Sequence, residues 1–157
     1  MSGKILLGVT GSIAAYKACE LISLLKKKGH AVKCAMTPDA ENFITPLTLE
    51  TLTCEKVARG MFRLPDNREP FHISLADWAD LILVAPATAD VIGKVAAGIA
   101  DDILTCTICA SPGPVLFAPA MNEGMYTIPI IQDKIAYLKQ KGHHFVGAVE
   151  GRLACGR

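Results

Sequence analysis

The chain has 157 residues, of which 51% are hydrophobic and 20% are charged, and its formal net charge is +1. This length suits one domain with a sizeable core, so we expect residues 1–157 to form a single domain. The small net charge gives no electrostatic reason to expect binding to nucleic acid or to an anionic membrane. No apolar run is long enough for a transmembrane helix, and residues 5–9 are too short for a signal-peptide core. We therefore expect a cytoplasmic protein.

Apolar runs alternate with helix-like segments along the chain. Strands are predicted at residues 4–10, 31–36, 80–85, 114–118 and 144–146. Helices are predicted at residues 13–28, 47–53, 72–78, 88–97, 101–110 and 128–141, and a further short helix starts at residues 37–39. Residues 59–71 are predicted to form the one long loop. This alternation predicts a doubly wound parallel sheet in a three-layer αβα arrangement.

Six cysteines are present, and in a cytosolic chain we expect them to be reduced thiols. Cys106 and Cys109 form a C-x-x-C pair inside an apolar helical segment. A zinc site would need two further ligands at a familiar spacing, which the sequence does not offer. We therefore predict no metal site, and we interpret the pair as buried small hydrophobic residues rather than as a redox pair.

The turn after the first strand, Gly8 to Ala15, brings glycine and the Ser12 hydroxyl to a helix N-terminus. It lacks the third glycine and distal acid of a dinucleotide fingerprint, and no Gly-Lys-Ser/Thr follows as in a P-loop. Backbone N–H groups at such a terminus favour an anion, and one phosphate fits this turn better than a pyrophosphate. The alternative is an ordinary tight turn with a serine cap.

Three other predicted strand ends lie at the same sheet edge, at Thr37, at Thr88 and at the octet Pro119-Ala120-Met121-Asn122-Glu123-Gly124-Met125-Tyr126. Asn122 offers one acceptor and two donors, although it is also a good helix N-cap. The two methionines of the octet offer soft, adaptable walls. The expected ligand is flat and partly apolar with one phosphate arm, and flavin mononucleotide (FMN) in a flavodoxin-like sheet meets that description.

Two further residues are candidates for proton transfer. His72 follows the long loop, and histidine gains or loses a proton near neutral pH, although it could simply begin a surface helix. Cys155 lies in a terminal segment of small residues. A thiol there can act as a proton donor, act as a nucleophile, or have no chemical role.

Several motifs together resemble one family, the homo-oligomeric flavin-containing cysteine decarboxylases. They are Gly11-Ser12-Ile13-Ala14-Ala15, His72-Ile73-Ser74-Leu75-Ala76-Asp77-Trp78-Ala79-Asp80, Ala85-Pro86-Ala87-Thr88-Ala89, Pro119-Ala120-Met121-Asn122 with Met125, and Leu153-Ala154-Cys155-Gly156. Each motif alone is weak, but the ordered set is specific and covers essentially the whole chain. Within the family, the chain looks most like members that decarboxylate 4′-phosphopantothenoylcysteine to 4′-phosphopantetheine in coenzyme A synthesis, through thioaldehyde and enethiolate intermediates.

The resemblance implies a flavodoxin-like subunit that binds FMN and assembles as trimers or as four trimers, with the active site at a subunit boundary. It implies that His72 is an acid–base residue and that Asn122 holds the cysteine carboxylate and amide region of the substrate. It further implies that Cys155 of a terminal flap donates the last proton and that Arg152 and Ala154 touch the substrate. The implied cofactor-binding positions are Gly11, Ser12, Ile13, Thr37, Thr88, Ala89, Asp90 and Met121.

Three positions depart from the family pattern. Asp90 stands where an asparagine is common, and its carboxylate would disfavour an anionic reduced flavin unless it is protonated or paired. Tyr126 stands where bacterial relatives often carry tryptophan. Arg157 ends the chain where relatives continue in a glycine-rich tail, so either the sequence is truncated or the flap is incomplete. A synthetase domain could also follow in the natural gene product.

Other functions are weighed against this one. A relative that decarboxylates the C-terminal cysteine of a peptide needs no final reduction, and the Ala-Cys-Gly flap argues against it. A non-enzymatic regulatory relative that binds a phosphatase would tend to have lost the histidine, asparagine or cysteine. The glycine pattern disfavours a nicotinamide-dependent enzyme, and a prenyl-transferring flavin relative would not need the flap.

Overall fold

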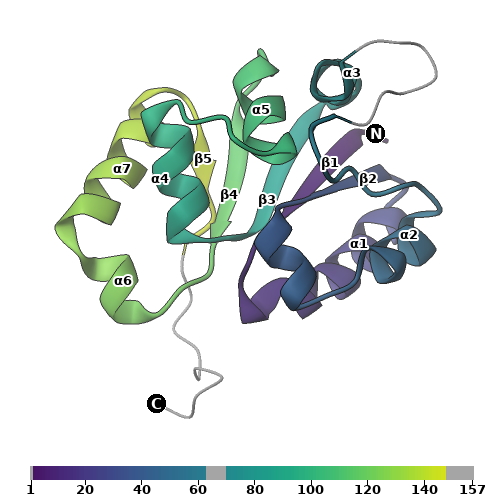
Figure 1. Ribbon diagram of the computed structural model, residues 1–157, viewed down its shortest axis with the longest axis horizontal. Coiled ribbons are helices and arrows are strands. Elements are labelled where there is room, and N and C mark those ends of the chain that lie inside the picture. The colour runs from purple at the N-terminus through teal and green to yellow at the C-terminus, as the bar shows by residue number, and fades with distance from the viewer. Residues whose placement is uncertain (1, 63–69, 148–157) are drawn as a thin grey trace.

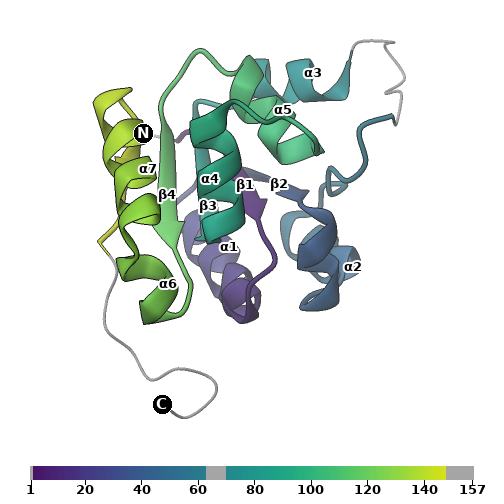
Figure 2. The ribbon, with the colours of Figure 1, turned by 60° about the vertical axis from the view of Figure 1, so that its left-hand side comes forward.

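The computed structural model describes residues 2–62 and 70–147, which form a five-stranded parallel sheet flanked by helices on both faces (Figures 1 and 2). The strand order is β2-β1-β3-β4-β5. The strands are β1 (Lys4–Val9), β2 (Ala31–Met36), β3 (Leu81–Ala87), β4 (Val115–Pro119) and β5 (His144–Phe145). In this order the chain reverses direction across the sheet between β1 and β3, which is the flavodoxin-like arrangement predicted from the sequence.

The two faces of the sheet carry different helices. One face is covered by the 3₁₀ helices η1 (Ile13–Tyr16) and η2 (Pro38–Asn42) and by α1 (Lys17–Lys27) and α2 (Pro46–Thr53). The other is covered mainly by α3 (Phe71–Trp78), α4 (Ala89–Ala97), α5 (Ile103–Ala110) and α7 (Pro129–Gln140), and the short α6 (Glu123–Thr127) follows β4.

Alternate residues of the continuously apolar strands supply the two cores. In β1, Leu6 packs into the core under α3, α4, α5 and α7, whereas Leu7 and Val9 pack into the core under α1 and α2. All three side chains are fully buried. A strand buried on both faces explains why its sequence is apolar throughout instead of alternating with polar residues.

Several details differ from the sequence-based prediction. The first helix begins as a 3₁₀ turn with Ser12 as its cap, and α6 was not predicted as a separate helix. Ala35 and Ala58 also form an isolated parallel bridge beside β2. Within the part of the chain that the structure describes, no helix is long and apolar enough to cross a membrane.

The prediction that both C-x-x-C thiols are buried was wrong. Cys109 is exposed and Cys106 is partly exposed, on a face of α5 turned away from the core. Threonines take inner positions instead, because their hydroxyls are satisfied locally: Thr107 donates to the Ile103 carbonyl, and Thr105 exchanges hydrogen bonds with Asp102. The five cysteines in residues 2–62 and 70–147 are free thiols in the structure.

Candidate functional site

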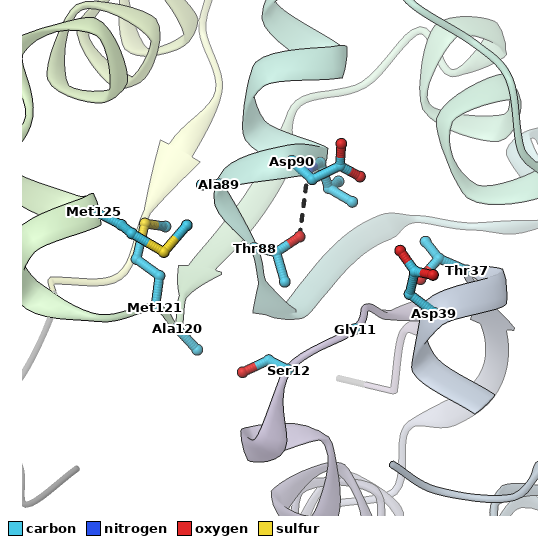
Figure 3. A pocket seen from close by; sticks show the side chains of 11 residues that line it. Gly11, Ser12, Thr37, Asp39, Thr88, Ala89, Asp90, Ala120, Met121 and Met125 are labelled. Atoms are coloured by element: carbon cyan, nitrogen blue, oxygen red, sulfur yellow. Dashed lines mark hydrogen bonds between the residues drawn. The ribbon is translucent and has the colours of Figure 1, made fainter. Parts of the chain in front are cut away.

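A cavity of about 290 Å³ opens at the carboxyl edge of the sheet, beside the point where β1 and β3 diverge (Figure 3). The four predicted strand ends all contribute to it. Its walls are formed by Gly11, Ser12, Thr37, Asp39, Thr88, Ala89, Asp90, Val91, Ala120, Met121 and Met125. Ligands of open α/β sheets bind at this position, because the loops diverge there and leave a crevice.

Gly11 allows the chain after β1 to pass close to η2. A Cβ atom added at Gly11 would lie 2.5 Å from the Asp39 Cβ and 3.2 Å from its backbone carbonyl carbon. The next residue, Ser12, caps η1, and its Oγ accepts a hydrogen bond of 3.3 Å from the Ala14 N–H. The serine cap is therefore present, and it lies in the cavity wall rather than away from it.

Thr37 contributes an unsatisfied polar atom to the cavity wall. The residue is 6% exposed, and its Oγ1 has no hydrogen-bond partner among residues 2–62 and 70–147. Its backbone N–H is satisfied by the Val9 carbonyl at 3.1 Å, so only the hydroxyl is left open. Buried polar atoms without partners are rare, and this one belongs to a residue of the cavity wall, where a bound ligand would supply the missing partner.

Thr10 fixes the loops that surround the cavity, a role that the sequence analysis missed. Its buried Oγ1 donates to the Pro86 carbonyl at 2.7 Å and accepts from the Thr88 N–H at 3.2 Å. Thr88 in turn caps α4 by accepting from Val91 N–H. The amides of Ala89 and Asp90, in the first turn of α4, have no acceptor within the helix and lie in the cavity wall.

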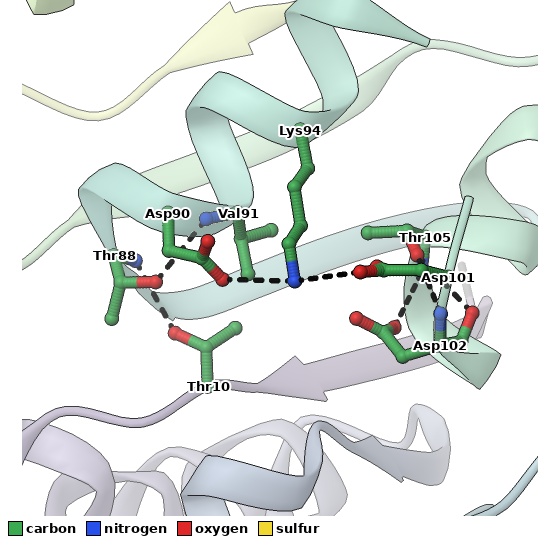
Figure 4. A network of polar contacts seen from close by, with 8 residues as sticks. All are labelled: Thr10, Thr88, Asp90, Val91, Lys94, Asp101, Asp102 and Thr105. Carbon is green, nitrogen blue, oxygen red and sulfur yellow. Dashed lines mark hydrogen bonds and ion pairs between the residues drawn. The ribbon is translucent and has the colours of Figure 1, made fainter. Parts of the chain in front are cut away.

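Asp90 is paired, which answers the question raised by its departure from the family pattern. Its Oδ2 lies 3.3 Å from the Nζ of Lys94, one turn along α4, and the same Nζ lies 3.2 Å from Asp101 Oδ2 (Figure 4). Partial burial lowers the pKa of Lys94, but hydrogen bonds to Asp101 and Asp90 outweigh that effect and raise the pKa above its ordinary value. Lys94 therefore stays charged. The spacing of Asp90 and Lys94 is visible in the sequence as an i,i+4 pair, but the contribution of Asp101 is not.

Asn122 is an N-cap, as the alternative interpretation proposed. Its Oδ1 accepts from the Gly124 N–H at 2.8 Å at the start of α6. The side chain is exposed, and its amide nitrogen has no partner in the described part of the chain, so its two donors remain available. Beside it, Met121 and Met125 form one wall of the cavity (Figure 3).

The remaining candidates lie elsewhere. Ile13 comes directly after Ser12 of the cavity wall in the sequence, but its side chain points outward, with 57% of the residue's surface exposed. His72 is half-buried near the start of α3, which Figures 1 and 2 place beside the amino ends of the strands, away from the cavity. Arg152, Ala154 and Cys155 lie outside the described residues. No group of potential metal ligands occurs within residues 2–62 and 70–147.

Fold and cavity together define a flavodoxin-like α/β protein with a ligand site at the switch point of its sheet. Residues 2–157 match the model of the family described as Flavoprotein, and the chain belongs to that family.

Curated relatives are similar over almost the whole chain. The "Coenzyme A biosynthesis bifunctional protein CoaBC" of Bacillus subtilis is 50% identical over 152 residues, which are 97% of this chain and 37% of that protein. The protein of the same name from Escherichia coli is 42% identical over 153 residues, which are 98% of this chain and 38% of that protein. The chain thus spans well under half the length of these relatives.

Solved structures share the fold. A variant of PPC decarboxylase complexed with pantothenoylaminoethenethiol matches with a TM-score of 0.87 at 28% identity, covering 99% of this chain and 87% of that one. The FMN-dependent cysteine decarboxylase SpaF matches with a TM-score of 0.86 at 30% identity, covering 92% of this chain and 83% of that one.

Proposed function

We propose that this chain is an FMN-dependent carboxy-lyase that converts 4′-phosphopantothenoylcysteine to 4′-phosphopantetheine in coenzyme A synthesis. The observation that carries the proposal is the cavity at the β1/β3 switch point, in a chain that matches CoaBC proteins over 97–98% of its length. We propose that residues 1–157 form one catalytic domain.

The cavity suits FMN on chemical grounds. Gly11 and Ser12, with the open amides of α4, favour an anion such as a phosphate. The unsatisfied Thr37 hydroxyl supplies a polar contact, and Met121 and Met125 supply an apolar wall. Bound FMN would supply oxidation of the substrate's CH2–SH carbon, which creates the electron sink that decarboxylation needs, and would later return the hydride. Ile13, next to Ser12, would contact the cofactor from the rim.

Three groups of the protein would act on the substrate. Asn122, beside the methionine wall, would use its free amide donors to hold the cysteine carboxylate and amide. His72 would move the thiol proton, since a thiol with an ordinary pKa near 8.5 needs a base to ionise at neutral pH. Cys155 would return the final proton, with Arg152 and Ala154 positioning the substrate.

We propose that the active site is completed by a second subunit, in a trimer or a tetramer of trimers in the cytoplasm. The separation of His72 from the cavity of its own subunit supports a site shared across a boundary. Large apolar side chains exposed on the described surface, such as Leu47 at 70% and Ile130 at 61%, are suited to burial between copies. The Tyr16 side chain, 61% exposed, is a further example.

The test is to purify the protein, record its flavin absorbance, add phosphopantothenoylcysteine and measure CO2 release together with the thiol product. We expect bound FMN, CO2, and a product at the oxidation level of 4′-phosphopantetheine. A colourless protein that also fails to bind added FMN would refute the proposal. A peptide ending in cysteine serves as the competing substrate, because the peptidyl-cysteine decarboxylase EpiD shares the fold.

A further inference from the structure

Asp90 places a negative charge on the wall of the cavity. Its carboxylate lies in the first turn of α4, between Ala89 and Val91, which line the same wall. Asp39 adds a second carboxylate from η2, and no ion pair of Asp39 occurs within residues 2–62 and 70–147. A ligand with a phosphate and an anionic reduced ring would be repelled by both carboxylates. A cation beside these carboxylates would reduce the repulsion and add to the attraction of the open α4 amides for an anion.

Lys94 is placed to supply that cation, and it is held from two sides. Figure 4 shows its ammonium between the carboxylates of Asp90 and Asp101, at 3.3 Å and 3.2 Å. The side chain of Lys94 is 25% exposed, whereas those of Asp90 and Asp101 are 59% and 54% exposed, so water screens both contacts and each is worth no more than an exposed ion pair.

The second carboxylate is itself fixed by the turn between α4 and α5. Gly98 ends α4 in a left-handed conformation with φ +71°, and the N–H of Ile99 bonds back to the Lys94 carbonyl at 2.9 Å. On the other side, Asp102 and Thr105 form a capping box that starts α5. The backbone on both sides of Asp101 is therefore held in place. Asp101 restrains the Lys94 ammonium, so Lys94 loses less side-chain entropy when it also pairs with Asp90.

We infer that Lys94 is a positioning residue that neutralises Asp90 at the cofactor cavity and thereby sets the affinity for FMN and the reduction potential of the bound flavin. Asp101 is the anchor that keeps the ammonium at Asp90. The inference rests on the proposed function, because FMN is the ligand whose charge is balanced. It explains how the chain carries a carboxylate at this wall without losing an anionic cofactor.

The decisive comparison uses three variants of the full chain prepared without flavin: Lys94→Met, the double variant Asp90→Asn with Lys94→Met, and Lys134→Met as a control that removes a lysine from α7. FMN is titrated into each while its fluorescence is followed, and the potential of the bound flavin is measured against a redox dye. We expect Lys94→Met to bind FMN up to about fivefold more weakly, the scale of one exposed ion pair, and to have a more negative potential. The double variant should recover both values, and the control should match the wild type.

Thermal unfolding of the same flavin-free proteins separates charge balance from structure. If Lys94 only stabilises α4, the melting temperatures of Lys94→Met and of the double variant should both fall, and the double variant should not recover FMN affinity. That result would overturn the inference. Wild-type affinity and potential in Lys94→Met overturn it as well. Failure of the wild type to bind FMN at all instead overturns the proposed function, and the inference with it.

Discussion

The two edges of the sheet use similar polar residues in opposite ways. At the amino edge, side chains accept hydrogen bonds from the backbone N–H groups at the starts of strands. The Gly3 N–H donates to His30 Nδ1 at 3.2 Å, the Lys4 N–H to Asp80 Oδ2 at 2.7 Å, and the Val115 N–H to His143 Nδ1 at 3.1 Å. At the carboxyl edge, the Thr37 hydroxyl has no partner in the described part of the chain, and the Asn122 amide donors are also open there.

This difference separates polar groups that stabilise the fold from polar groups that await a ligand. A histidine or aspartate that accepts a strand-initial N–H contributes to the free energy of unfolding, and the accepting atom is no longer free for a ligand. The buried Thr37 hydroxyl costs stability until a ligand supplies a partner, whereas the exposed Asn122 amide can exchange water for a ligand. Substitutions at the carboxyl edge should therefore change binding and activity, whereas those at the amino edge should change stability.

The largest effect is expected at Asn122. Asn122→Asp keeps the oxygen that accepts from Gly124 N–H, and aspartate is an equally good N-cap, so α6 and FMN affinity should be preserved. The new charge would repel the substrate carboxylate, and like charges in contact cost several kcal/mol, so kcat/KM should fall by about a hundredfold or more. The measurement is CO2 release against substrate concentration, with the FMN dissociation constant as the internal control. Unchanged turnover would remove Asn122 from the substrate site.

A somewhat smaller effect is expected at Gly11, where the close approach to Asp39 leaves no room for a Cβ atom. Gly11→Ala forces the turn or η2 to shift, and overpacking of this kind costs about 1–3 kcal/mol, which corresponds to about 5- to 150-fold in FMN affinity if the cavity is what deforms.

The amino edge provides the matched control for that substitution. A Cβ at Gly113, just before β4, would meet only the Ser111 Oγ at 3.9 Å, so Gly113→Ala should bind FMN like the wild type. Equal affinities in the two alanine variants would show that the Gly11 turn does not form part of the cofactor site.

Much of the fold could be predicted because the signal is local. Apolar or mostly apolar segments predicted the first four strands, and the short segment 144–146 was a weaker prediction of the fifth. Thr45-Pro46 and Gly98 correctly predicted a helix start and a helix end. α6 escaped prediction because it has five residues and buries none of them, so it has no apolar periodicity to detect. The exposure of Cys109 was also missed, since which face of α5 meets the core depends on packing against α3 and the sheet.

The site was predictable where a residue follows a strand, and not where chain segments meet through side chains. Thr37, Thr88 and Met121 each follow a strand, and all three line the cavity. Thr10 and Asp101 could not be predicted, because one bridges β1 to the β3–α4 loop and the other reaches α4 only through the turn that follows it. Assignment of FMN contacts and catalytic roles to individual residues stays a prediction.

The smallest expected effect tests the amino edge, at His143. Its Nδ1 must be unprotonated to accept the Val115 N–H, and its ring packs edge-on against the Phe117 ring at 6.0 Å. Burial, with a smaller contribution from His144, lowers the pKa of His143 below its ordinary 6.5. Between the folded and unfolded pKa values the unfolded chain binds more protons, so this stability is present above pH 6.5 and is lost as the pH falls through the folded pKa. The loss should be about 1 kcal/mol or less, the scale of one hydrogen bond.

The measurement is the free energy of unfolding by urea between pH 5 and pH 8, in wild type and in His143→Asn. The asparagine Oδ1 can accept from Val115 N–H without titrating, so the part of the pH dependence that belongs to His143 should vanish in this variant while stability at neutral pH changes little. His144→Asn removes the exposed neighbour and should retain most of the dependence, because burial is the larger cause of the lowered pKa. If His143→Asn keeps the full wild-type slope below pH 6.5, the strand cap at His143 is not what titrates. FMN affinity at neutral pH should be the same in both variants, since neither lies at the carboxyl edge.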